Sequence, residues 1–420
     1  MSDIQSKDLK RGQFMYICEA ALEYLISILV CGSFLATLTG ALGFSDSLTG
    51  ILSSVISLGC VFQMLSVFFR RKRVKWFVIA MSVTNQILFM LLYIIPIFDI
   101  PGRIKTILFV GFIFAAYFIY NIAHPKKINW LMSLVEDGFR GVFTANKEIV
   151  SLICGMTFTY VMGALIDHFS AKNEMRTALI LSACVIFVLM LLHTLTMMLT
   201  PETEQPKTQA KNIFHCVKDV FKNKAVMKVT MVFVLYSIAA YAAGPFYGTY
   251  LIGELALSLK TISILSIASS LVRIFVSRFW GRYADRTSFS NMIQKCFLIL
   301  AAGYGCVAMA VPENGIWMFA LYYMCSGIAM GGINSALINM IYDYVGIEQR
   351  ADSLAVCQAS SGLIGFLSTI VASMFVAYVQ GNGNRILGIS MYAQQAVSVI
   401  ACVVILGTYT YVRVAFKKKV

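Results

Sequence analysis

A chain of 420 residues with 59% hydrophobic and only 13% charged residues has too little polar surface to cover a water-soluble globule of this size. Its net charge of +14 comes from Lys and Arg clustered between long apolar runs, a pattern typical of membrane topology signals and not of nucleic-acid binding. Eleven scattered Cys without C-x-x-C spacing argue against a disulfide framework or a cysteine metal site. The composition therefore predicts an all-α polytopic membrane protein.

Twelve apolar stretches are long enough to cross a bilayer, which takes about 20 residues of α-helix. In chain order they cover roughly residues 14–41, 48–69, 76–98, 106–134, 142–166, 177–199, 226–251, 258–279, 292–311, 315–342, 354–379 and 389–412. The longest polar interval, 200–225, divides them six and six. We therefore expect an N-terminal six-helix bundle at 1–199, a cytoplasmic linker at 200–225 with an amphipathic surface helix over 212–222, and a C-terminal six-helix bundle at 226–420.

The distribution of basic residues predicts the orientation of the chain. If both termini are cytoplasmic, most of the 34 Lys and Arg lie in the inner segments and few lie in the outer loops. Inner loops of membrane proteins carry this excess of positive charge. We therefore expect an integral, multi-pass protein of the plasma (inner) membrane with both termini in the cytoplasm.

The two halves contain an internal duplication, in which residues 124–155 share a polar skeleton with residues 334–365. The matched pairs are Asn129 with Asn339, Arg140 with Arg350, Ser151 with Ser361, and Gly155 with Gly365. Each pair is 210 positions apart, half of the 420-residue chain. A period this long indicates two similar bundles, pseudo-symmetric with each other, and not a solenoid.

Span one carries two carboxylates, Glu19 and Glu23, one helical turn apart on the same face. An ionised side chain near the bilayer centre costs roughly 2.5–3.5 kcal/mol on insertion scales, so it usually faces a cavity or a partner. Glu19 is expected near enough to the interface to reach water. Glu23, ~13 Å beyond Phe14 at ~1.5 Å per residue, is the stronger candidate for proton coupling or substrate contact. The alternative is a structural ion pair with a basic neighbour.

Span four should continue past residue 124 if the duplication is followed, because span ten continues through the matching positions. One face of that helix would then carry Tyr117, Asn121, His124 and Lys127 as candidate substrate-binding residues. The second copy has no charge here, since Asn334 and Leu337 stand at the positions of His124 and Lys127. The alternative is that span four ends near residue 123 and that the following HPKK is a basic loop.

Span seven combines tyrosines with helix-disturbing residues. Gly244 and Pro245 predict a kink or hinge, because Pro removes a backbone hydrogen bond and Gly permits bending. Tyr236 and Tyr241 could stack on a sugar, a nucleoside or a planar drug, or serve as interfacial anchors.

Spans ten and eleven add polar candidates. Tyr323 and Asn334 share a face of span ten, on which Gly327 and Gly331 form a small-x-x-x-small packing strip. Gln358 is a weaker substrate-binding candidate in span eleven.

The sharpest local motif is GRYADR at 281–286, after the eighth span. Gly281 would let two helix ends approach closely, while Asp285 and Arg286 would form charged bonds that hold and release the helices. The alternative is a tight, charged turn that sets topology. Arg140 and Arg350, at the turns entering spans five and eleven, are either further cytoplasmic gate contacts or ordinary positive-inside charges.

Twelve spans in two halves, a long central loop and G-x-x-x-D-R after the eighth span together resemble the major facilitator superfamily of transporters. The resemblance covers the whole chain, although residues 69–75 after span two lack the Gly and Asp that the superfamily usually has there. It implies that spans one, four, seven and ten line a central pathway. That implication, and not spacing, places Glu23 near Lys127.

The resulting interpretation is a secondary active transporter that moves a small solute by alternating access, as a symporter or antiporter with protons as a candidate coupling ion. Glu23, with Glu19, would be the coupling group, and Lys127 would stabilise its ionised form or hold an anionic substrate. The alternatives are a multidrug or metabolite exporter and, in a different class, a non-transporting receptor or a membrane enzyme.

The absence of known catalytic motifs limits the functions and partners that we expect. It contains no nucleotide-binding, zinc-protease or serine-hydrolase motif, so we expect no enzyme activity, no catalytic residues, no cofactor and no metal. The expected partners are the solute and the lipid bilayer, without nucleic acid, for a protein that acts as a monomer.

Overall fold

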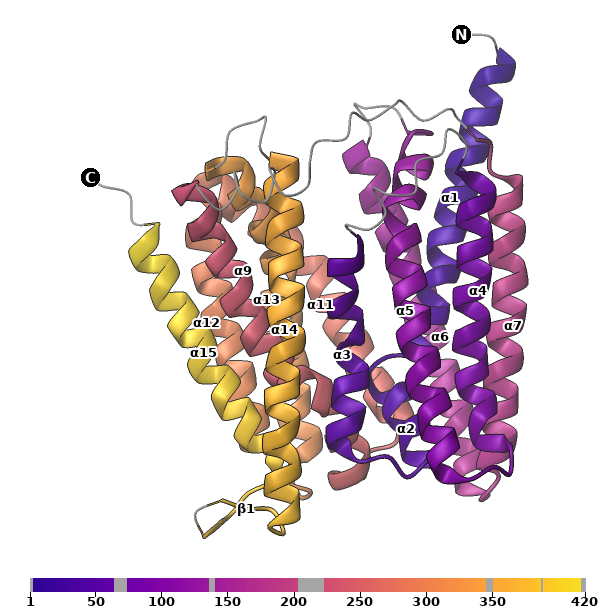
Figure 1. Ribbon diagram of the computed structural model, residues 1–420. Coiled ribbons are helices and arrows are strands. Elements are labelled where there is room, and N and C mark those ends of the chain that lie inside the picture. The colour runs from indigo at the N-terminus through magenta and orange to yellow at the C-terminus, as the bar shows by residue number, and fades with distance from the viewer. Residues whose placement is uncertain are drawn as a thin grey trace. The chain divides into compact units, whose positions relative to one another are not determined.

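The computed structural model describes residues 3–63, 74–135, 140–202, 223–344, 350–386 and 388–416, which are almost entirely helical (Figure 1). The helices that can cross a membrane are α1 (Asp3–Leu29) with α2 (Gly32–Ala41), α4 (Lys75–Ile94), α5 (Gly102–Met132), α6 (Arg140–Ala171), α7 (Met175–Leu199), α9 (Lys224–Ala243), α11 (Leu259–Arg286), α12 (Phe289–Ala308), α13 (Gly315–Tyr344), α14 (Arg350–Gly381) and α15 (Ala393–Ala415). The expected helix at 212–222 lies outside the described residues, as do residues 69–73.

Within the described residues, ten helices are long and apolar enough to cross a membrane, and the bent pair of α1 and α2 would be an eleventh. The predicted first span is not straight, because α1 and α2 meet at an angle of 42°. Gly32 begins α2 with φ of +52°, a backbone conformation that side chains other than glycine disfavour. A further helix, α3 (Asp46–Phe62), has 17 described residues and covers the second predicted span in part.

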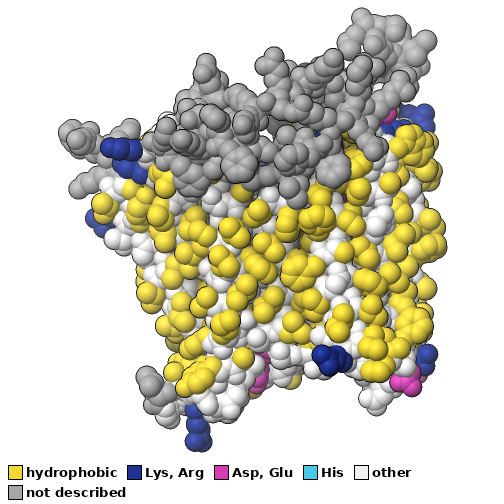
Figure 2. All heavy atoms as spheres, in the orientation of Figure 1, with side chains coloured by type: hydrophobic (Ala, Val, Ile, Leu, Met, Phe, Trp, Pro, Cys, Tyr) yellow, Lys and Arg dark blue, Asp and Glu magenta, His cyan; other side chains and the backbone are white. Residues whose placement is uncertain are grey.

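Hydrophobic side chains cover the middle of the helices on the face shown in Figure 2, and charged side chains lie toward the helix ends. Large apolar residues such as Phe275, Val371 and Met374 are more than two-thirds exposed in the absence of lipid. A surface of this kind is stable only in a bilayer. The chain is therefore an integral, multi-pass membrane protein.

The chain folds as two compact units, here called unit 1 and unit 2. Unit 1 comprises Met1–Phe44, Val61–Gln209 and Ser258–Ser263, and unit 2 comprises Ser45–Cys60, Ala210–Leu257 and Ile264–Val420. Most of α3 therefore packs with unit 2, and the first turn of α11 packs with unit 1. The division into two six-helix bundles at residues 1–199 and 226–420 remains a prediction from the sequence.

Each unit has its own helix packing. In unit 1, α4 packs against α5 and α7, while α1 packs against α6 and α7, around a core that includes Tyr16, Trp130 and Met197. In unit 2, α12 lies between α13 and α15, and α9 packs against α14 and α15. A short hairpin of β1 (Arg385–Ile386) and β2 (Ile389–Ser390) connects α14 to α15.

Reciprocal caps fix α4 against α7 in unit 1. The carboxylate of Glu202 accepts hydrogen bonds from the backbone N–H groups of Val74 and Lys75 at the start of α4, at 2.6 and 2.9 Å. The Lys75 ammonium in turn donates to the carbonyls of Met198 and Thr200 at the end of α7, both at 2.8 Å. Opposite charges thus meet both helix dipoles, and the two helices are held in a defined register.

Two other carboxylates hold the segments that α3 and α11 contribute to the opposite unit. In unit 2, one oxygen of Asp46 accepts bonds from the amides of Gln380 and Gln394, at 2.8 and 2.7 Å. In unit 1, Asp167 accepts the backbone N–H groups of Leu259 and Lys260 at the start of α11, at 3.0 and 2.7 Å. An acidic side chain therefore helps to anchor each segment.

The predicted continuation of span four is confirmed. Helix α5 runs unbroken from Gly102 to Met132 with Pro125 inside it, so HPKK is helical and not a loop. The predicted irregularity in span seven is also present. After α9 the chain forms a 3-10 turn at Gly244–Phe246, a short α10 (Tyr247–Thr249) and a π-helical turn at Tyr250–Glu254.

Small residues allow close helix packing where the sequence predicted a packing strip in span ten. A Cβ atom on Gly327 of α13 would lie 2.5 Å from the backbone oxygen of Ser269 in α11. A Cβ on Gly331, one turn later, would lie 3.3 Å from the backbone oxygen of Arg273. The strip is therefore a backbone-to-backbone contact that no larger residue can make without a shift.

Substitution of Gly327 tests this contact. The variant Gly327→Ala should lower the free energy of unfolding by about 1–3 kcal/mol, because the methyl group meets fixed backbone. Gly305→Ala in α12 is the matched control, since a Cβ there meets nothing within 4 Å. The control should be neutral or slightly stabilising, because alanine favours helix. Thermal unfolding of the purified proteins in detergent measures both, and equal melting temperatures would contradict the assignment.

Candidate transport site

A buried ammonium group lies at the centre of unit 1. The Nζ atom of Lys127 on α5 is 2.9 Å from Glu19 Oε1 and forms a second ion pair with Glu23 Oε2, both on α1. The helical spacing of Glu19 and Glu23 places both carboxylates on the face of α1 that meets α5. Lys127 is 3% exposed, so water does not screen these interactions.

The structure corrects the expected position of Glu19. Its side chain is 1% exposed and does not reach water at the interface, whereas Glu23 is 24% exposed. Glu19 is enclosed because two partners surround it, Lys127 and the imidazole of His193 on α7. The more accessible carboxylate is therefore Glu23.

His193 is the member of the site that the sequence did not single out. It is fully buried, with Nε2 at 3.2 Å from Glu19 Oε1 and Nδ1 at 3.0 Å from the amide nitrogen of Gln86 on α4. The sequence feature that could have identified it is a lone His in the middle of an apolar span, because such a side chain needs polar partners. Glu19, Glu23, Lys127 and His193 are called the charge cluster below.

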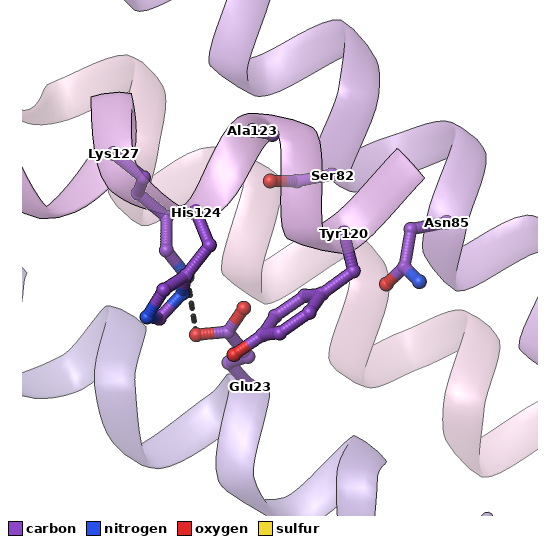
Figure 3. Close-up of a pocket in the computed structure, with 7 residues that line it drawn as sticks. All are labelled: Glu23, Ser82, Asn85, Tyr120, Ala123, His124 and Lys127. Atoms are coloured by element: carbon purple, nitrogen blue, oxygen red, sulfur yellow. Dashed lines mark hydrogen bonds and ion pairs between the residues drawn. The ribbon is translucent and has the colours of Figure 1, made fainter. Parts of the chain in front are cut away.

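A small cavity of about 10 Å³ adjoins the charge cluster, close to the space that one water molecule needs (Figure 3). Its lining consists mainly of polar side chains from α1, α4 and α5, namely Glu23, Ser82, Asn85, Tyr120, Ala123, His124 and Lys127. The rings of Tyr120 and His124 lie 5.0 Å apart beside the ion pair. Within the described part of the chain, the buried Nδ1 of His124 has no hydrogen-bond partner.

Glu19, Glu23 and His193 bring ligand atoms within 4.8 Å of one another, a spacing that could hold a metal ion. Lys127 already supplies a cation to both carboxylates at hydrogen-bond distance. A metal ion would therefore have to displace or repel the ammonium group. The arrangement suits an internal ion pair better than a metal site.

Tyr117 and Asn121 share α5 with Lys127 but take up other contacts. The Tyr117 ring packs edge-on against Phe89, with centroids 5.3 Å apart. Asn121 donates to the Tyr117 carbonyl and accepts from Gln63, at 2.8 and 3.0 Å. Neither residue lines the cavity, whereas Tyr120 of the same helix does.

The candidates in unit 2 have mixed surroundings. Tyr236 stacks on Phe297 and donates to the sulfur of Met330, and Tyr241 packs against Gly365. Tyr323 contacts the rings of Phe319 and Tyr322, whereas Asn334 and Gln358 are exposed in unit 2. These positions are described within unit 2 alone, so their relation to the charge cluster remains a prediction.

The gate motif differs from its predicted geometry. Residues 281–286 belong to the helix α11 and do not form a turn between helices. Among the residues that the structure describes, a Cβ on Gly281 would meet nothing within 4 Å, so no close approach to another described helix is seen there. Asp285 and Arg286 are exposed, and no ion pair joins them within the described residues. Arg140 and Arg350 begin α6 and α14, but their side chains lie outside what the structure describes.

Removal of the ammonium group should destabilise unit 1. In Lys127→Met the buried Glu19 loses its cation, and breaking a buried pair on one side costs about 3–5 kcal/mol. The double variant Lys127→Met/Glu19→Gln should recover part of this loss, because the fully buried carboxylate is then neutral. Lys126→Met is the matched control, as the adjacent half-buried lysine forms no ion pair within the described residues. Chemical unfolding measures all three, and a stable Lys127→Met would contradict the electrostatic account.

The chain resembles known transporters in both sequence and fold. Residues 14–286 and 229–419 match the sequence profile of the Major Facilitator Superfamily. A mutant of the nucleoside transporter NupG has a TM-score of 0.74 at 15% identity, covering 97% of this chain and 100% of that one. The D-xylose–proton symporter has a TM-score of 0.67 at 12% identity, covering 94% of this chain and 96% of that one.

A mutant of the E. coli fucose–proton symporter FucP has a TM-score of 0.56 at 13% identity, with 98% of each chain covered. No curated protein sequence matches this chain at a significant level. The superfamily predicted from the spans and the 281–286 motif is confirmed by the profile match, which spans both halves. This chain therefore belongs to the Major Facilitator Superfamily, whose members are transporters and not enzymes.

Proposed function

We propose that this transporter moves a small polar solute by alternating access and couples that movement to protons at the charge cluster. The observation that carries the proposal is Lys127, buried between two carboxylates beside a cavity with polar walls. Ionisable groups inside membrane helices usually mark substrate or proton pathways.

The charges of the cluster favour proton coupling. Two carboxylates face one ammonium group, so the cluster carries one excess negative charge when His193 is neutral. A proton on Glu23 would remove that excess and release Lys127 from one of its partners. Glu23 is suited to exchange protons because it lines the cavity and is partly exposed, whereas Glu19 is enclosed by Lys127 and His193.

The cavity walls indicate the chemistry of the solute. The cavity of about 10 Å³ holds no more than one water molecule, so the solute would bind here in a more open conformation. Ser82, Asn85, Tyr120 and His124 would then offer hydroxyl, amide, phenol and imidazole groups, which pair with hydroxyl and amide groups of a neutral solute. Transporters of similar fold include ones named for a nucleoside, D-xylose and fucose, and these solutes are rich in such groups. The unpartnered Nδ1 of His124 is a ready contact.

Other parts of the proposal rest on the sequence. The distribution of Lys and Arg supports cytoplasmic termini in a plasma (inner) membrane. Tyr236, Tyr241, Tyr323, Asn334 and Gln358 are proposed to contact the solute from unit 2, and Gly281, Asp285, Arg286, Arg140 and Arg350 to act during cytoplasmic closure. Contact between Asp285 or Arg286 and another helix would then form in a different conformation.

The coupling role of Glu23 can be tested in proteoliposomes with and without an imposed proton gradient. Candidate sugars and nucleosides are supplied as radiolabelled solutes. Glu23→Gln should abolish accumulation driven by the gradient, because the amide cannot release a proton. Glu174→Gln, an exposed acidic position at the start of α7, is the matched control and should accumulate solute normally. Gradient-driven uptake with unchanged pH dependence in Glu23→Gln would rule out this coupling assignment.

A further inference from the structure

The polar contacts of His193 are not used in the coupling step proposed at Glu23. It lies within α7, is fully buried, and has both ring nitrogens in contact with polar groups. Glu19 lies on one side of the ring and Gln86 on the other. A buried imidazole needs a partner for each ring nitrogen, and Glu19 and Gln86 meet that requirement.

The contacts define which nitrogen carries the proton. The amide nitrogen of Gln86 can only donate, so Nδ1 of His193 is the acceptor and Nε2–H donates to Glu19. The imidazole is neutral in this arrangement. With the Gln86 amide in this orientation, its Oε1 atom is buried without a hydrogen-bond partner in the described part of the chain.

The unpartnered oxygen gives the pocket a second arrangement. If the Gln86 amide turns over, Oε1 faces Nδ1 and can accept a hydrogen bond from a protonated Nδ1–H group. His193 would then donate from both nitrogens, as an imidazolium ion, to Gln86 and Glu19. The oxygen and nitrogen of an amide are nearly equal in size, so this change needs no movement of α4 or α7.

The charged and titratable groups near His193 come from several helices. Glu19 of α1 contacts the ring, and Glu23 brings a carboxylate oxygen within 4.8 Å of it. Lys127 of α5 pairs with both carboxylates, Tyr16 lies near Glu19, and His124 lies near Lys127. From α6, Lys147 reaches the hydroxyl of Tyr16 at 3.5 Å. The α4 partner, Gln86, is neutral. A proton on His193 brings the charge cluster from one excess negative charge to neutrality.

We propose that His193 is a proton-binding residue of the charge cluster and that the amide of Gln86 turns over to accommodate the bound proton. This inference rests on the proposed function, since it adds a second proton site to the same cluster. Glu19 Oε1 contacts both His193 and Lys127. A proton on His193 therefore draws Glu19 away from Lys127 electrostatically, which leaves the ammonium group to Glu23 and the solute.

The protonation state can be measured without transport. The chain has four His, so replacing His124, His168 and His215 by Gln leaves His193 as the only imidazole. Nitrogen NMR of the isotope-labelled full chain in lipid nanodiscs should show a neutral ring with Nε2 protonated at high pH. It should change to a doubly protonated ring as the pH is lowered across the range in which the protein stays folded. A ring that stays neutral throughout that range would overturn the inference.

A second variant separates proton binding from a structural role. Gln86→Glu offers a carboxylate to Nδ1 and should hold His193 doubly protonated over the same pH range. A neutral ring in this variant would also overturn the inference, because a purely structural imidazole keeps its tautomer. The single-histidine protein retaining only His168, an exposed residue near the end of α6, is the control and should not respond to Gln86→Glu.

Transport provides the final readout. His193→Gln should lose solute accumulation driven by a proton gradient, and His168→Gln should retain it. Normal accumulation in His193→Gln would overturn the part of His193 in coupling, even if the ring titrates. If the unaltered protein transports none of the solutes tested, the proposed function fails, while the NMR measurements still decide whether His193 binds a proton.

Discussion

Lys127 brings a full positive charge into the interior of unit 1, and the surrounding helices are positioned to meet it. Two carboxylates from α1 contact its ammonium group, and His193 from α7 supports the more deeply buried carboxylate. Removing water from a charge is costly unless partners replace its hydration. The mutual placement of α1, α5 and α7 is therefore tied to this one side chain, and α4 joins them through Gln86.

The second half of the chain shows that such a position can be packed without charge. At the 210-residue offset, Leu337 stands in place of Lys127, and both are buried. The same offset places Val229 and Phe233 of α9 at the positions of Glu19 and Glu23, again as buried residues. Apolar replacements of buried ion pairs are often as stable as the pairs themselves. Folding alone therefore does not explain the charges of the first half, whereas the proposed handling of solute and protons would account for them.

The sequence identified Glu23 and Lys127 because charged residues in apolar spans are conspicuous, and the duplication correctly extended α5 through Lys127. Their pairing came from the family resemblance, since contacts between helices depend on how each helix is rotated in the bundle. The same dependence explains why the burial of Glu19 and the role of His193 were missed. The close approach predicted at Gly281 is not seen among the described residues, and it stays a prediction for another conformation. A motif can name the residues of a contact but not the conformation in which they meet.

The caps between α4 and α7 bear on how the two halves could be separated. Glu202 lies inside the predicted linker, 200–225, as the last described residue before residue 223, and its carboxylate holds the start of α4. A version of the protein expressed as two fragments would keep this anchor only if the break falls after Glu202. A break a few residues earlier would leave the backbone N–H groups of Val74 and Lys75 without this acceptor. The usable boundary of the N-terminal fragment thus extends past its last membrane helix.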